Sequence, residues 1–108
     1  MLQQLYTARG ESLANTPWEI YPRPQMKRAS YVNLNGEWDF SVNEESVGTI
    51  RVPFCPESAL SGIQKHFPEG STLCYRRVFS LPQGFHRGRV LLHIGAADQT
   101  AEVFINGI

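Results

Sequence analysis

Residues 89–107 constrain the fold of this chain more than any other stretch. Residues 90–94 read VLLHI, a nearly unbroken apolar run with β-branched members, which is typical of a strand covered on both faces. Residues 101–105 read AEVFI and show the two-residue alternation of a half-buried strand. The stretch therefore predicts two strands of a sheet rather than a helix.

A polar interruption separates these two predicted strands. Residues 95–100 read GAADQT, and this composition favours a bulge or irregular crossover in which small residues let Asp98 point away from the core. Asp98 is therefore the best-placed polar residue for binding. The alternative is that its carboxylate caps the bulge by bonding its own backbone.

Asn106 and Gly107 follow the second predicted strand directly. This dipeptide is a strong hairpin signal because both residues tolerate the positive φ of a type I′ turn. Only Ile108 comes after it, so the strand that would return from the turn is missing. We therefore expect this chain to be a piece of a longer one, with exposed strand edges through which it can self-associate.

The earlier part of the chain shows short strands separated by turn signals. The expected elements are strands at residues 37–42, 49–52 and 73–81 and one or two helical turns at residues 56–62. In the first of these strands, Trp38 and Phe40 lie on the apolar face and are expected in the core. The pattern predicts an all-β fold, and most simply a β-sandwich.

Arg77 is the charged residue on the more apolar face of the predicted strand at residues 73–81. The simplest interpretation is a stem that lies over the core, with the guanidinium at the edge or paired with a carboxylate. The alternative is an anchor for a neighbouring domain.

The N-terminal part carries a different pattern. Residues 1–16 are polar and poorly periodic, which indicates a lead segment laid over the domain or partly disordered. Residues 17–24 contain three prolines and Trp18, and they predict an extended strap pressed by its aromatics against the core. An exposed Trp18 that stacks on a sugar is the alternative. We expect the domain itself to span residues 17–108.

The charge balance argues against partners held by bulk electrostatics. Ten Lys and Arg offset ten Asp and Glu, so neither duplex nucleic acid nor an anionic membrane is an expected partner. No apolar run reaches the ~20 residues of a membrane span. Residues 1–7 lack the basic and apolar regions of a secretory signal, so a cytoplasmic location is expected.

The sequence offers little catalytic or metal-binding chemistry. His66, His86 and His93 do not have the spacing of a metal site, and no phosphate loop, dinucleotide turn or nucleophile elbow is present. Cys55 and Cys74 are too few for a disulfide framework and are expected as reduced thiols. We therefore expect no cofactor, no metal and no catalytic residue in this chain.

Four motifs occur in the order and spacing of a known family. They are residues 34–40 (LNGEWDF), residues 52–58 (VPFCPES), residues 75–82 (YRRVFSLP), and Asp98 ahead of a strand that ends in Asn106-Gly107. With these motifs the chain, from about Tyr21 onward, resembles the N-terminal sugar-binding domain of glycoside hydrolase family 2, the β-galactosidase, β-glucuronidase and β-mannosidase group.

The resemblance implies a jelly-roll β-sandwich of the galactose-binding-domain-like type, incomplete at its C-terminus. Enzymes of this family are retaining glycosidases that carry both catalytic glutamates on a separate TIM barrel further along the chain. This chain alone is therefore expected to be non-catalytic and to pack on that barrel.

The resemblance also implies that Asp98 reaches into the mouth of the barrel and binds the carbohydrate substrate. An ionised carboxylate suits this role because it can accept hydrogen bonds from two adjacent sugar hydroxyls. Two other functions stay open: a free-standing carbohydrate-binding module and a purely structural or interaction domain.

Overall fold

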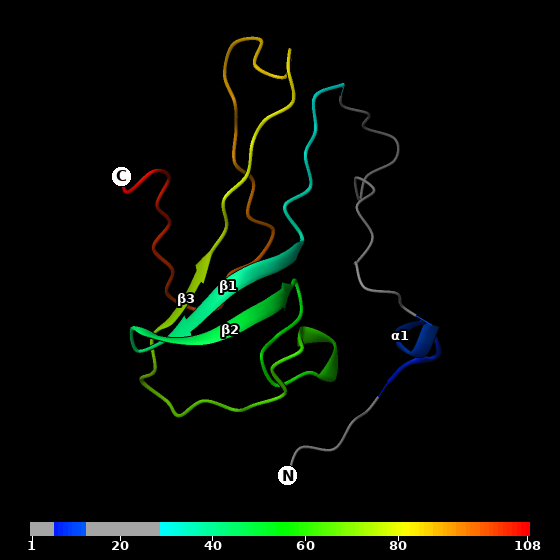
Figure 1. Ribbon diagram of the computed structural model, residues 1–108, viewed down its shortest axis with the longest axis vertical. Helices are drawn as coiled ribbons and strands as arrows, with labels where there is room; N and C mark the ends of the chain where they lie inside the picture. Colours follow the sequence, from blue (N-terminus) through cyan, green and yellow to red (C-terminus); the bar gives the residue numbers. More distant parts are fainter. Residues whose placement is uncertain (1–5, 13–28) are drawn as a thin grey trace.

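The structure is a computed structural model that describes residues 6–12 and 29–108 (Figure 1). Its elements are α1 (Ala8–Ser12), β1 (Gly36–Val42), β2 (Glu45–Val52), the 3-10 helix η1 (Ala59–Ser61) and β3 (Leu73–Arg76). Most of the predicted lead segment and the whole aromatic strap at residues 17–24, Trp18 included, lie outside the described residues.

The strands form an antiparallel sheet with β1 between β2 and β3 (Figure 1). Regular structure in the described ranges is thus mostly sheet with little helix, and the predicted all-β class is confirmed at this level. The sheet is the element around which the rest of the described chain is arranged.

A two-residue turn at Asn43 and Glu44 joins β1 to β2. Both residues have positive φ, 49° and 69°, which is the requirement of a type I′ turn. Because this turn closes the ladder at once, Glu45 already pairs with Val42. The strand that we expected at residues 49–52 therefore begins four residues earlier, and the expected turn at residues 43–46 is shorter.

Phe40 and Ile50 form the centre of the core, each with 1% of its surface exposed. The Phe40 ring packs against Phe67, with ring centroids 5.8 Å apart, and against Tyr75, with centroids 5.2 Å apart. The expected core position of Phe40 is confirmed. Trp38 lies on the same face but is only half-buried, so one of the two predicted core aromatics sits at the edge of the core.

The third strand is shorter than predicted. We expected it to span residues 73–81, but β3 ends at Arg76, whose partner in β1 is Asp39. At the next residue the side chain of Arg77 turns toward the chain just ahead of β1 and bonds backbone carbonyl groups there. The ladder with β1 stops at this point.

One helical turn lies between β2 and β3, as the residues at 56–62 predict. It is the 3-10 helix η1, and it ends at Gly62 in the left-handed conformation, with φ of 83°. The buried Ser61 hydroxyl donates to the carbonyl oxygen of Ser58 at 2.7 Å and accepts from the backbone N–H of Ile63 at 3.0 Å. None of the helices at residues 6–12 and 29–108 is both long and apolar enough to cross a bilayer.

The prediction of strands at residues 90–94 and 101–105 is wrong for this structure. Both segments run without a β-ladder, and their apolar side chains are exposed, with 64% of Leu91 and 66% of Phe104 accessible. Alternation of side chains prepares a segment for a sheet, but a strand forms only where a neighbouring backbone accepts its hydrogen bonds. No such neighbour is present among the described residues.

The turn at Asn106 and Gly107 is confirmed. The two residues have φ of 52° and 81°, and Ile105 and Ile108 exchange both backbone hydrogen bonds at 3.0 and 3.1 Å. This is the geometry of a type I′ hairpin turn. The local turn chemistry therefore acts here even though the preceding segment belongs to no sheet.

Candidate functional site

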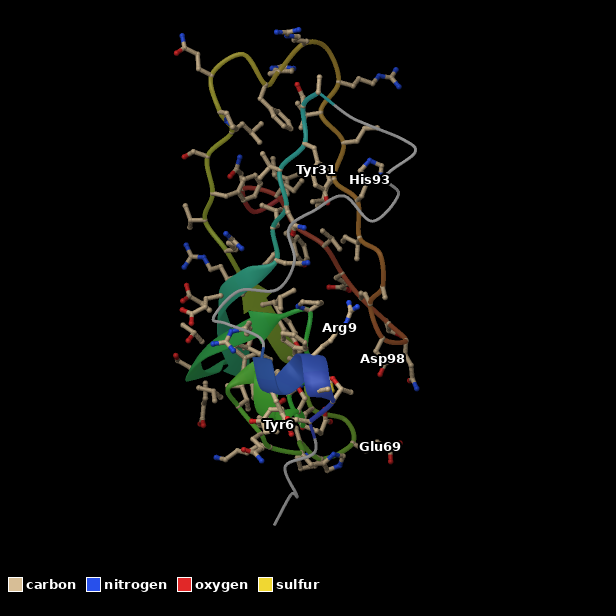
Figure 2. All side chains as sticks on the ribbon, turned by 90° about the vertical axis from the view of Figure 1, so that its right-hand side faces the viewer. Tyr6, Arg9, Tyr31, Glu69, His93 and Asp98 are labelled. Atoms are coloured by element: carbon tan, nitrogen blue, oxygen red, sulfur yellow. The ribbon has the colours of Figure 1, made fainter. Side chains whose placement is uncertain are left out.

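Asp98 lies at the tip of a loop between residues 90–94 and residues 101–105. Figure 2 shows the chain reversing its direction there, with the Asp98 side chain at the outer edge of the molecule. The neighbouring Gln99 has a positive φ of 48°, which contributes to the reversal. Asp98 is exposed, so its carboxylate is accessible to a ligand from solvent.

The Asp98 carboxylate makes no hydrogen bond or ion pair to any residue in the ranges 6–12 and 29–108. The backbone cap that we considered as an alternative for Asp98 is thus not formed within that part of the chain. A free carboxylate offers two oxygen atoms as acceptors. The loop is therefore chemically suited to a ligand that presents hydroxyl groups, and nothing in the fold neutralises its charge.

A second cluster of polar groups surrounds the exposed edge of the core. His66 Nδ1 lies 3.5 Å from Glu57 Oε1, and Glu57 and Cys55 both lie near Tyr75. Burial, then the negative charge of Glu57, then Cys55 raise the pKa of Tyr75 above its ordinary value. Tyr75 therefore stays protonated, and its hydroxyl remains a hydrogen-bond donor.

Sequence reasoning missed this cluster. His66 was placed in a loop and Tyr75 on a strand, with no reason to bring them near each other. The loop between η1 and β3 brings them together, because it returns Phe67 to the core against Phe40. The only signal in the sequence was the apolar Phe67 inside an otherwise polar loop.

Arg77 holds the entry to β1. Its Nη1 atom donates to the carbonyl oxygens of Leu34, at 2.6 Å, and Asn35, at 2.8 Å, and the indole N–H of Trp38 donates to the same Leu34 oxygen at 2.7 Å. The guanidinium is thus bound to backbone carbonyl groups, and the expected pairing with a carboxylate is wrong. The carbonyl oxygens ahead of a strand lack ladder partners, and Arg77 satisfies two of them.

No arrangement suited to a metal ion occurs in the described ranges, where no group of three or more His, Cys, Asp or Glu side chains converges. Among the three histidines, only His66 has an acidic partner within ion-pair distance there. Cys55 and Cys74 are free and exposed. The polar chemistry of this part of the chain therefore consists of the Asp98 loop and the cluster beside Tyr75.

No protein-family model matches the chain, and no curated protein matches it. Its functional assignment therefore depends on the residues and their geometry.

Proposed function

We propose that this chain is the N-terminal, non-catalytic sugar-binding domain of a glycoside hydrolase of family 2, built as a jelly roll that further strands complete. In the full-length enzyme the domain packs on the catalytic TIM barrel and helps to shape the pocket in which an O-glycosidic bond is hydrolysed. The chain itself contributes no catalytic carboxylate. Its contribution is Asp98, which accepts hydrogen bonds from hydroxyl groups of the carbohydrate.

The observation that carries this proposal is the state of Asp98. A structural role would need the carboxylate to be buried and bonded to its own loop, and the described residues provide neither condition. An exposed carboxylate at a loop tip can accept from two adjacent hydroxyl groups, and charge-assisted hydrogen bonds of this kind are about twice as strong as neutral ones. This chemistry selects a polyhydroxyl ligand.

The packing of the motifs gives further support. The motif at residues 34–40 contributes β1 and the motif at residues 75–82 contributes the end of β3, and these strands pair with each other. Arg77 of the second motif bonds the carbonyl oxygens of Leu34 and Asn35 in the first. Residues that resemble one family in sequence thus form one structural unit, which is what a shared fold requires.

The proposal is tested by titrating the isotopically labelled chain with galactosides and glucuronides and following the amides of residues 98–100 by NMR. We expect saturable shifts confined to this loop, and we expect Asp98→Ala to abolish them. Asp98→Asn retains one acceptor oxygen and should weaken binding without abolishing it. Glu69→Ala removes another exposed carboxylate and should leave the shifts unchanged. A well-dispersed spectrum that no sugar perturbs would refute recognition by this chain.

A second candidate function is a structural or interaction domain. The observation in its favour is the apolar surface that the chain exposes after Arg77, where Val78 is 81% accessible. Such surfaces on soluble proteins mark sites of contact with another protein surface. This function does not exclude sugar recognition, since the apolar side chains and Asp98 are different residues of the same segment.

A further inference from the structure

Residues 78–108 carry most of the exposed large apolar side chains of the described chain. We call the following set the C-terminal apolar surface: Val78, Phe79, Leu81, Val90, Leu91, Leu92, Ile94, Val103, Phe104, Ile105 and Ile108. Their exposed fractions range from 40% at Leu81 to 94% at Ile108. By contrast, the sheet buries its own apolar residues around Phe40 and Ile50.

The size of this surface matches what a stable protein interface needs. One such side chain removes ~60–120 Å² of apolar area from water when it is fully buried. With the exposed fractions above, the set leaves roughly 400–800 Å² of apolar area accessible. A standard interface buries about 800 Å² per partner, of which roughly 60% is apolar. The C-terminal apolar surface is therefore large enough for one interface.

Residues 90–94 are the part of this surface best suited to pairing with another strand. Val90, Leu92 and Ile94 alternate with Leu91 and His93, so both faces of the segment are apolar apart from one imidazole. Its backbone belongs to no ladder in the structure. A segment with unpaired backbone groups and apolar faces is a template for strand addition.

We propose that a second copy of this chain occupies the segment, and that the two copies pair their residues 90–94 as antiparallel strands about a two-fold axis at Leu92. In this register Val90 faces the partner's Ile94, and Leu91 faces the partner's His93. The arrangement is isologous, so one contact closes the dimer and leaves no free copy of the same edge.

Charge favours this occupant. The formal net charge of the chain is zero, so two copies approach without mutual repulsion. In the proposed register Arg89 faces the partner's Gly95, and no like charges stand opposite each other along the segment. A nucleic acid or an anionic lipid surface would instead need a cationic face, which residues 90–94 do not provide.

The proposal does not rest on sugar recognition, because it concerns Leu92 and not Asp98. It is tested by sedimentation equilibrium of the 108-residue chain over a range of micromolar concentrations. We expect a reversible monomer–dimer equilibrium. Leu92→Lys should weaken the dimer by at least about a hundredfold, because the two-fold axis brings two buried charges together. Val47→Lys changes an apolar residue of similar exposure on β2, 42% against 45%, and should leave the dimer intact.

Amide hydrogen exchange supplies the second measurement. Because Leu92 lies outside the sheet, Leu92→Lys should preserve the exchange protection of β1, and this shows that the variant is folded. In the wild-type chain the amides of residues 90–94 should gain protection as concentration rises. A strictly monomeric chain, a Leu92→Lys variant that dimerises like the wild type, or open-ended aggregation in place of a dimer would each overturn the proposal.

Discussion

Asn43 and Thr72 bond each other twice across 29 residues of chain. The backbone N–H of Asn43 donates to the carbonyl oxygen of Thr72 at 2.9 Å, and the N–H of Thr72 donates to Asn43 Oδ1 at 2.9 Å. The turn between β1 and β2 is thereby tied to the entry of β3. The position requires both a side-chain acceptor and a backbone that accepts positive φ, and Asn meets both requirements.

Asn43→Ala should lower the free energy of unfolding by about 1–2 kcal/mol, since the substitution removes the acceptor for Thr72 and strains the positive φ. Asn43→Gly keeps the backbone freedom and loses only the acceptor, so its effect should be smaller. Asn43→Asp keeps both properties and serves as the control. Urea unfolding of the three variants measures the difference, and equal stabilities for Ala and Asp would contradict the assignment.

Gly36→Ala should destabilise the chain by about 1–3 kcal/mol. Gly36 has φ of +125°, and an added Cβ would lie 3.3 Å from Arg77 Nη1. Gly95→Ala is the matched control, because Gly95 has no positive φ and an added Cβ there meets no atom within 4 Å. Thermal unfolding of both variants checks the prediction, which requires Gly36→Ala to be clearly the less stable of the two.

Arg77→Ala should cost about 1.5–3 kcal/mol, because it leaves the Leu34 and Asn35 carbonyl oxygens without their cationic donor. Trp38 shares the Leu34 oxygen, so its fluorescence should change in the folded state. Arg76→Ala removes the adjacent, exposed arginine and should be nearly neutral. If Arg76→Ala and Arg77→Ala destabilise the chain equally, the two hydrogen bonds do not hold the entry to β1.

The stability of the fold should fall at high pH through Tyr75. Burial and the charge of Glu57 raise its pKa above 10.0 in the folded chain, so the folded state holds its proton more tightly than the unfolded state does. The stabilisation is fully present below the unfolded pKa and is lost as the pH rises through the folded value. Tyr75→Phe should reduce the decline in stability above pH 10, measured by unfolding at several pH values.

Glu57→Gln tests the cause of that shift. Removing the charge should lower the pKa of Tyr75, although burial should still hold it above the ordinary value of 10.0. Ultraviolet titration of tyrosinate, with Tyr75→Phe as the reference that identifies the signal, follows this change directly. An unchanged titration in Glu57→Gln would assign the whole shift to burial.

Turns were the most predictable feature of this protein. The Asn106-Gly107 turn forms as expected, since the positive φ values that it needs are a property of the two residues themselves. The helical turn that ends at Gly62 is also present, in a shorter form. The amphipathic pattern at residues 37–42 correctly placed β1 and the buried Phe40, because a two-residue period leaves one choice of inward face.

The extent of the strands was less predictable. The pattern at residues 73–81 continues past Arg76, yet β3 ends there, where Arg77 bonds the carbonyl groups ahead of β1. Residues 90–94 have the stronger apolar pattern of the two and belong to no strand. In both cases the missing information was the position of a second backbone, which local composition does not contain.

By itself, the sequence determined the all-β class, the positions of the tight turns, the inward face of β1 and the choice of Asp98 as the candidate ligand-binding residue. Each of these depends on the conformational preferences or the alternation of neighbouring residues. Only the tertiary structure decided where β3 ends, which carbonyl groups Arg77 binds, and that Glu57 and His66 gather beside Tyr75. These depend on contacts between residues far apart in the chain, and such contacts are set by how the whole backbone packs.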